Sequence, residues 1–202
     1  MRRPLLLLAA VALVGGACSS EDGRVLPPPR PDQTTTTTST TVAGDPGDGS
    51  VGQGAVEVFS LFSEAFAGGT EIPVEHTCDG ADVPPPLAWA SAPPAAELAI
   101  VVRDPDADGF VHWVVTGIDP LVQGFGAGGV PEGAVEHANG FGTVGWRGPC
   151  PPEGEVHTYE LALYALPEPL VVGDPDEAPE ALVIQVEQAA SAVAVLTGTY
   201  GR

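Results

Sequence analysis

Two histidines and one tyrosine have side chains suited to holding a small anion, and one aspartate could orient a histidine. His157 and Tyr159 are two residues apart in the segment His-Thr-Tyr-Glu-Leu. Residues i and i+2 of a β-strand share a face, so we expect both side chains on one face. Imidazole and phenol groups donate hydrogen bonds to an anion, and protonation of the imidazole strengthens its bonds. Upstream, His112 offers a second imidazole, and the carboxylate of Asp104 could orient an imidazole through its other nitrogen.

A Gly/Pro loop comes directly before the His157 strand. Residues 148–152 read Gly-Pro-Cys-Pro-Pro and include Cys150, Pro151 and Pro152. Proline fixes φ, so this loop should be stiff. A stiff loop beside two polar side chains suits one wall of a small, pre-formed pocket. A proline-rich turn followed by an ordinary core strand would have the same sequence pattern, so this stretch alone leaves both interpretations open.

The elements that must position these side chains are mostly strands. Short apolar and β-branched runs, bounded by Gly, Pro and Asp, predict strands, and one segment with proline in its first turn predicts a helix. The predicted strands are 55–62, 97–103, 111–117, 157–166 and 192–200, and the predicted helix is 179–189. We therefore expect one mostly β domain over residues 55–202, with long loops and a single helix near its C-terminal end.

Charge excludes several kinds of partner. The 202-residue chain has a net charge of −20 and contains no lysine. From Ala55 onward, 22 acidic residues stand against three arginines, a net charge of −19 with neutral histidines. Binding to nucleic acid or to anionic lipid headgroups depends on Lys and Arg. We expect neither for this domain.

The first 18 residues are typical of an export signal. Met-Arg-Arg precedes an apolar run from Leu5 to Val14, which is too short to span a bilayer, and small residues lead to Cys18. The pattern resembles a bacterial lipoprotein signal, in which Cys18 would be the first mature residue and would carry the lipid. An ordinary cleaved signal with an incidental cysteine is the alternative. With lipid on Cys18, the domain would be extracytoplasmic and held at the cell membrane.

Residues 19–54 have the composition of a disordered tether. They contain three consecutive prolines, a Thr/Ser run from Thr34 to Thr41, and Gly/Asp repeats. No part of this segment could bury a core, so we expect a spacer between membrane and domain.

Two cysteines remain if Cys18 carries lipid. Cys78 and Cys150 both lie in Gly/Pro-flanked turns, and a pair of thiols in an exported domain predicts a disulfide. Two free buried thiols are the alternative, since the sequence does not give the distance between the two Cα atoms.

Seven short motifs follow one another along the second part of the chain. In order they are His76-Thr-Cys-Asp-Gly80, Pro85-Pro-Leu-Ala-Trp89, Asp104-Pro-Asp-Ala107, His112-Trp113, Gly148-Pro-Cys-Pro-Pro152, His157-x-Tyr159 and Gly198-Thr-Tyr200. Each motif alone is weakly specific. Together, over about Phe59–Arg202, they resemble the phosphatidylethanolamine-binding protein family, and in particular its bacterial, Raf kinase inhibitor-like branch.

The resemblance implies a β-rich fold with a small anion pocket near one edge of the sheet. Matched motif by motif, the pocket residues would be Asp104, His112, Cys150 to Pro152, His157 and Tyr159. The family is described as binding phosphate or phospholipid-headgroup analogues there, and some members inhibit kinases or proteases. Thr158 stands where the family commonly has Arg, which removes a cation and should weaken anion binding.

We therefore expect a non-catalytic, anchored binding module without a cofactor. Its partner would be a small anion or another protein of the cell envelope; a cytosolic kinase would be out of reach. One alternative is an enzyme in which His112, His157 and Asp104 hold a metal ion or act as acid and base. The HExxH, CxxC and GxSxG patterns are absent. A protease inhibitor acting through the long loops is the other alternative.

Overall fold

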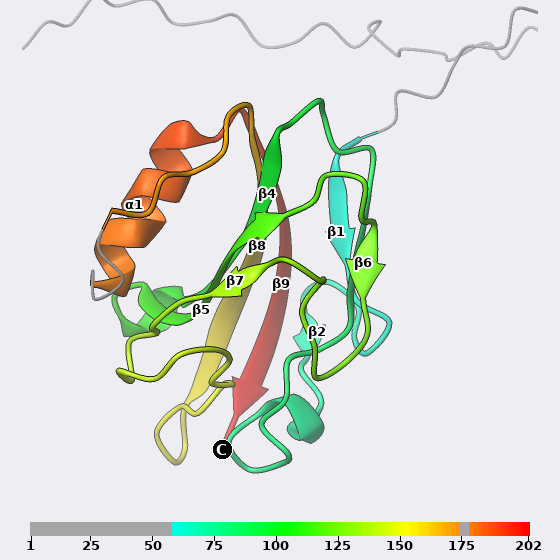
Figure 1. Cartoon of the computed structure of the whole chain (residues 1–202). Coiled ribbons are helices and arrows are strands. Elements are labelled where there is room, and N and C mark those ends of the chain that lie inside the picture. The colour runs from blue at the N-terminus through cyan, green and yellow to red at the C-terminus, as the bar shows by residue number, and fades with distance from the viewer. Residues whose placement is uncertain (1–57, 174–177) are drawn as a thin grey trace, which may run out of the picture. The chain divides into compact units, whose positions relative to one another are not determined.

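The structure of the chain is a computed structural model, which describes residues 58–173 and 178–202 (Figure 1). The predicted export signal, the lipid-bearing Cys18 and the tether lie outside the described residues. No helix of the described part is long and apolar enough to cross a membrane.

A six-stranded sheet forms the centre of the domain. Its strand order is β2-β9-β8-β4-β5-β7, and all neighbours are antiparallel except the short β2, which runs parallel to β9. The strands are β2 (Thr70–Glu71), β4 (Glu97–Asp104), β5 (Phe110–Ile118), β7 (Val135–Glu136), β8 (Val156–Leu166) and β9 (Ala192–Gly201). The four longest strands therefore lie side by side, and β2 and β7 extend the sheet at its two ends.

A smaller antiparallel sheet packs on one face of the large sheet. It has the order β1-β3-β6 and consists of β1 (Ser60–Phe62), β3 (Leu87–Ala90) and β6 (Gly124–Phe125). Leu61, Leu87 and Trp89 from this sheet join one hydrophobic core with residues of the large sheet, among them Leu161. The indole N–H of Trp89 donates to a loop carbonyl, so this buried ring has no unpaired polar atom.

Helix α1 (Pro179–Ala189) covers the opposite face of the large sheet (Figure 1). Proline occupies its first turn, where a missing N–H costs no hydrogen bond. Leu182, Val183 and Val186 are buried against the sheet. The sequence predicted a stripe through 182, 186 and 189, but Ala189 is exposed and Val183 takes its place, because the helix lies on the sheet along a slightly rotated face.

Strand β8 is shared by both cores. Along its first half the side chains alternate, and Tyr159, Leu161 and Leu163 face the core under the small sheet, as their spacing predicted. From Leu161 to Leu166 both faces are buried, because the helix covers the side that carries Tyr164. The strand thus runs from a half-open end at His157 to a fully enclosed interior.

The predicted fold class, mostly β with one C-terminal helix, is confirmed. The predicted strand 55–62 is described only as β1, since residues 55–57 lie outside the described part. The sequence did not indicate β2, β3, β6 or β7. These strands have two to four residues and lie in Gly- and Pro-rich connections, so they carry no periodic pattern. They form only where a neighbouring strand supplies backbone hydrogen-bond partners.

Candidate functional site

Asp104 and His157 form a buried hydrogen-bonded pair at one end of the large sheet. Strands β4 and β8 are antiparallel, with Arg103 opposite Glu160, so the last residue of β4 lies beside the first residues of β8. Asp104 Oδ2 accepts a hydrogen bond from His157 Nδ1 at 2.7 Å. The two residues are only 3% and 9% exposed, respectively. The sequence predicted this aspartate as an imidazole-orienting group, and the structure places it in that position.

The other oxygen of Asp104 holds the turn after β4. Asp104 Oδ1 accepts the backbone N–H groups of Asp106 and Ala107 at 3.0 and 3.1 Å, and so caps the 3₁₀ helix η2 (Pro105–Ala107). Asp106 Oδ2 accepts the N–H of Thr158 at 2.7 Å, which ties the turn to β8. Asp108 closes the turn in a left-handed conformation, with φ of 55°. The acidic turn therefore fixes the orientation of the Asp104 carboxylate.

His157 is held between two carboxylates. Its Nε2 lies 3.1 Å from Glu155 Oε2, on a side chain that is 58% exposed. The hydrogen bond to Asp104, and then that to Glu155, raise the pKa of His157 above its ordinary value. The imidazolium form is therefore favoured, and both of its N–H groups already have acceptors. Sequence reasoning missed Glu155, although its position two residues before His157 puts it at the entrance of the same strand.

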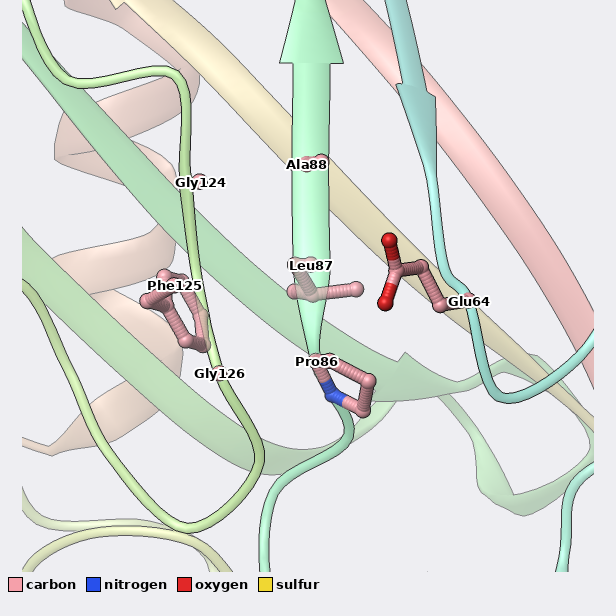
Figure 2. Close-up of a pocket in the computed structure, with 7 residues that line it drawn as sticks. All are labelled: Glu64, Pro86, Leu87, Ala88, Gly124, Phe125 and Gly126. Atoms are coloured by element: carbon pink, nitrogen blue, oxygen red, sulfur yellow. The ribbon is translucent and has the colours of Figure 1, made fainter.

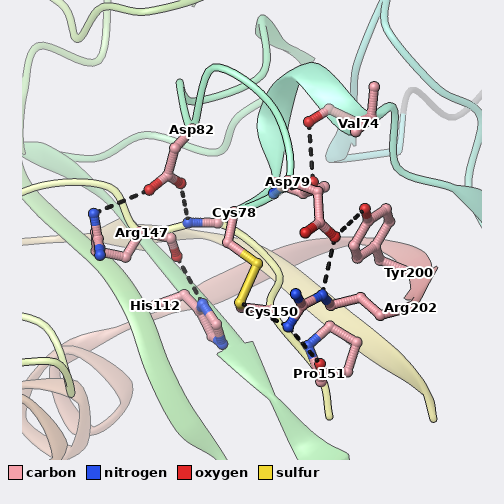
Figure 3. The surroundings of a disulfide bond; sticks show 12 residues. Val74, Cys78, Asp79, Asp82, His112, Arg147, Cys150, Pro151, Tyr200 and Arg202 are labelled. Atoms are coloured by element: carbon pink, nitrogen blue, oxygen red, sulfur yellow. Dashed lines mark hydrogen bonds and ion pairs between the residues drawn. A yellow bond between two sulfur atoms is a disulfide. The ribbon is translucent and has the colours of Figure 1, made fainter. Parts of the chain in front are cut away.

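His112 has the opposite electrostatic character. Its Nδ1–H donates to the Arg147 carbonyl at 2.7 Å, and burial lowers its pKa, although that hydrogen bond and the charge of Asp104 act against the shift (Figure 3). The neutral ring then keeps a lone pair on Nε2. Unlike the donor expected from the sequence, neutral His112 offers an acceptor at this atom.

A bulge in strand β5 sets the position of His112. Strand β4 pairs Val102 with Trp113 and Arg103 with Val111, so His112 is the extra residue between two successive pairs. Such bulges redirect side chains, and no pattern in the sequence indicated this one.

Tyr159 lies between the two histidines and has a buried hydroxyl group. Its ring is 5.3 Å from that of His112 in an edge contact and stacks on that of His157 at 6.5 Å. The residue is 1% exposed, and its hydroxyl makes no hydrogen bond with any described residue. Burial, and then the charge of Asp104, raise the pKa of Tyr159, so the hydroxyl keeps its proton; the Asp104 carboxylate and the Cys150 backbone lie close enough to act on it without a hydrogen bond of good geometry.

An aromatic wall lies on the other side of His112. The ring centroids of Phe110 and Phe141 are 5.3 and 5.6 Å from that of His112, and the Arg147 guanidinium lies over Phe141 at 5.8 Å. Gly140 allows this packing, because a Cβ at that position would overlap the Phe110 ring. Sequence reasoning singled out neither phenylalanine: Phe110 is the first residue of β5, directly after Gly109, and Phe141 lies between two glycines in a connection.

The loop with Cys150, Pro151 and Pro152 lies next to Tyr159, since the backbone of Cys150 is close enough to affect the pKa of that residue. Cys150 forms a disulfide with Cys78, the pairing expected from the cysteine count, with Cα atoms 5.4 Å apart. The Arg147 carbonyl at the start of the loop accepts from His112, so the loop forms part of the same arrangement. Pro151 is buried and Pro152 is exposed.

We refer to Asp104, His112, His157 and Tyr159 as the Asp/His/Tyr cluster. All four residues are buried. Two surface pockets of the described residues lie elsewhere. One, with a volume of about 320 Å³, lies over the small sheet and is lined by Glu64, Pro86, Leu87, Ala88, Gly124, Phe125 and Gly126 (Figure 2). Another, of about 330 Å³, lies beside β7 and includes His137. Neither includes a member of the cluster.

The remaining histidines and the tryptophans have structural roles. His76 Nδ1 bonds to the Val83 carbonyl, and His137 Nε2 bonds to Thr116 Oγ1. All three tryptophans are buried in the core. Within the described ranges, no group of three or more His, Cys, Asp or Glu side chains is arranged to hold a metal ion.

Comparisons with known proteins place the chain among its relatives. Residues 62–201 match the family model described as phosphatidylethanolamine-binding protein. The Mycobacterium tuberculosis protein named "Putative lipoprotein LppC" is 45% identical over 150 residues, which cover 72% of this chain and 74% of that protein. The crystal structure of the Chlamydia trachomatis protein described as a "Putative PhosphatidylEthanolamine-Binding Protein (PEBP) Homolog" is similar, with a TM-score of 0.64 and 33% identity over 71% of this chain and 97% of that chain. The crystal structure of Escherichia coli YbcL has a TM-score of 0.67 and 27% identity over 71% of this chain and 98% of that chain. The chain belongs to the phosphatidylethanolamine-binding protein family.

Proposed function

We propose that the Asp/His/Tyr cluster binds a small oxyanion, such as phosphate or a phosphorylated headgroup. The observation that carries the proposal is the buried hydroxyl of Tyr159, which lacks an acceptor beside a histidine that favours its charged form. A buried polar group without a partner costs about 1–3 kcal/mol, and a bound ion or ligand is one way in which such a group is satisfied.

The carboxylate of Glu155 occupies a position that an anion could take. It accepts from His157 Nε2, but its side chain is 58% exposed and makes no other hydrogen bond among the described residues. An oxyanion that displaces Glu155 would accept from His157, and its further oxygen atoms could accept from Tyr159. Asp104 would keep Nδ1 of His157 engaged and the ring in place.

The surrounding charge favours weak binding that improves at low pH. The domain is strongly acidic, and Thr158 provides no cation beside the cluster. Protonation of His112, whose pKa is lowered by burial, would add a second charged imidazole. We therefore expect affinity for phosphate to rise as the pH falls from 7.5 to 5.

Tyr159→Phe provides the direct test. The variant removes a hydroxyl that makes no well-formed hydrogen bond within the described residues, so the folded domain should lose little stability. Affinity for phosphate should fall about tenfold, the value of a hydrogen bond to a charged acceptor. Calorimetric titration with phosphate and with phosphoethanolamine at pH 6 measures the affinity, and thermal unfolding without ligand measures the stability. Equal affinity in both proteins, or no binding by the parent protein, would refute the proposal.

We further propose that this domain acts outside the cytoplasm, held to the membrane by lipid on Cys18. The name of the mycobacterial relative, which describes a lipoprotein, supports this location, as does the pattern of residues 1–18. In this setting the cluster would serve a binding or regulatory role. Cys18→Ser should move the protein from the membrane fraction to the soluble fraction in a bacterial host with a lipoprotein pathway, and an unchanged distribution would contradict the anchor.

A further inference from the structure

The Cys78–Cys150 disulfide lies at the surface, with the guanidinium of Arg202 beside one of its sulfur atoms (Figure 3). Both half-cystines are exposed. The Nη1 group of Arg202 donates to Cys150 Sγ at 3.7 Å. The carboxylate of Asp79, the residue after Cys78, pairs with the same guanidinium, and no charged group contacts the sulfur of Cys78 among the described contacts. Exposed disulfides are the ones that external thiols can reach, and they are more labile than buried structural disulfides.

The backbone and side chain of Arg202 hold the guanidinium in place. The Arg202 N–H donates to the Glu155 carbonyl, and the Arg202 carbonyl accepts from Gly154, which fixes the residue beside the end of β8. Its Nε donates to Asp79 Oδ2 at 3.0 Å, and the hydroxyl of Tyr200 donates to the same oxygen at 2.8 Å. The Nη1 group is therefore directed toward the sulfur of Cys150 by a fixed frame.

This asymmetry makes the two sulfur atoms chemically different. In thiol–disulfide exchange, the sulfur that leaves as a thiolate departs faster when its thiolate is more stable. A nearby arginine stabilises a thiolate, and Arg202 contacts only the sulfur of Cys150 among the described contacts. Cys150 is therefore the better leaving group, and Cys78 is the sulfur at which a nucleophile should attack.

We propose that the disulfide is a thiol-exchange site, modified at Cys78 by an external thiol. The incoming thiolate forms a bond to Cys78 Sγ, the bond between the two protein sulfur atoms breaks, and its electron pair goes to Cys150 as a thiolate beside Arg202. The products are a mixed disulfide on Cys78 and a free Cys150. With a dithiol, the second thiolate attacks the mixed disulfide, which leaves both cysteines reduced and the dithiol oxidised.

The charge of the domain limits which thiols react well. Asp79 and Asp82 lie in the loops that carry or contact the disulfide, and the domain as a whole is strongly acidic. An anionic thiol is repelled at close range, and salt weakens that repulsion. The preferred reactant is therefore a neutral or cationic thiol.

Hydrogen bonds hold the same two loops together after exchange. The Cys78 N–H donates to the Pro149 carbonyl at 3.1 Å, and the Gly148 N–H donates to Asp82 Oδ1 at 2.7 Å. The Arg147 guanidinium also pairs with Asp82 at 3.2 Å. The modified protein should therefore remain folded, and the reaction is a modification of the native domain.

The test uses the full chain with Cys18→Ser, whose only cysteines are Cys78 and Cys150. The protein is mixed with cysteamine or glutathione, quenched with an alkylating agent, and mapped by mass spectrometry. We expect the early mixed disulfide on Cys78, and faster reaction with cysteamine than with glutathione by a margin that shrinks in 0.5 M salt. Early modification mainly on Cys150, or equally on both cysteines, would overturn the proposal.

Two arginine variants separate the local effect from net charge. Arg202→Gln should slow exchange about threefold, since a Brønsted slope near 0.5 turns a moderate loss of thiolate stability into a factor of this size. It should also spread the modification over both sulfur atoms. Arg103→Gln removes the same charge on the face of the sheet that helix α1 covers, where Arg103 pairs with Glu160 and Glu187, and should change neither result. Identical rates and sites in both variants would refute the role of Arg202.

Discussion

Loss of the disulfide should lower the stability of the domain by an amount set by the loop that it closes. The perturbation is the double substitution Cys78→Ser/Cys150→Ser. The two cysteines are 72 residues apart, and the chain-entropy model gives about 4 kcal/mol for a loop of that length at 25 °C. Both half-cystines are exposed, so serine removes little buried surface and the loop closure should dominate. For a domain of this size the loss corresponds to a fall in Tm of about 10–15 °C.

Urea unfolding and calorimetry of the parent protein and the double variant measure this difference. The parent protein, fully reduced and alkylated, should lose as much stability as the double variant, because both remove the same cross-link. Each single serine variant should match the double variant. A loss below about 1 kcal/mol would refute the reasoning, since it would mean that the unfolded chain gains little freedom when the cross-link is removed.

Three further outcomes follow from the surroundings of the site. The raised pKa of His157 predicts a contribution to stability that is fully present below about pH 6.5, the ordinary pKa of histidine. That contribution is lost as the pH rises through the higher pKa of the folded state. Asp104→Asn should flatten this pH profile in thermal melts, and an unchanged profile would contradict the pairing. Glu155→Gln should raise phosphate affinity about two- to fivefold by titration, the range for an exposed ion pair, and equal or weaker binding would argue against competition by Glu155. Gly148→Ala should cost about 1–3 kcal/mol in urea unfolding, because its Cβ would overlap the His76 carbonyl; full stability would show that the loop can move away.

Matched variants serve as controls for these tests. Glu153→Gln removes the same charge from the same exposed loop without touching His157, so phosphate affinity should stay within the small general effect of net charge. Gly173→Ala tests a glycine with open space around it and should leave stability nearly unchanged.

The two histidines of the cluster explain why the site should respond to pH in two stages. His157, between two carboxylates, favours the charged form, whereas His112, buried against the Arg147 carbonyl, favours the neutral form. Their environments move the two pKa values in opposite directions. Near neutral pH the cluster therefore combines a charged donor, His157, with a neutral acceptor, His112. The sequence alone predicted two equivalent donors.

The long elements of the fold were predictable because their patterns are local. The alternation that begins at His157, the apolar run from Glu97, and the segment that starts at Pro179 each bury a face of fixed period, and all three formed the expected element. The turn after Asp104 was also predictable, since Asp and Pro favour such turns through contacts with their own backbone.

The short strands and the closure of the site were not predictable in this way. The placement of His112 depends on a bulge relative to β4, and the contact of Glu155 with His157 depends on how the loop before β8 returns to the sheet. Such features come from pairings between segments that lie far apart in the chain, and they leave no periodic trace in the sequence.

The sequence by itself determined the mostly β class, the helix, and the residue types available for anion binding, because side-chain spacing and proline and aspartate chemistry act over a few residues. Tertiary structure decided which of those residues meet, which histidine is charged, and which sulfur lies beside Arg202. Those properties depend on burial and on through-space electrostatics, and both arise only when distant strands and loops are brought together.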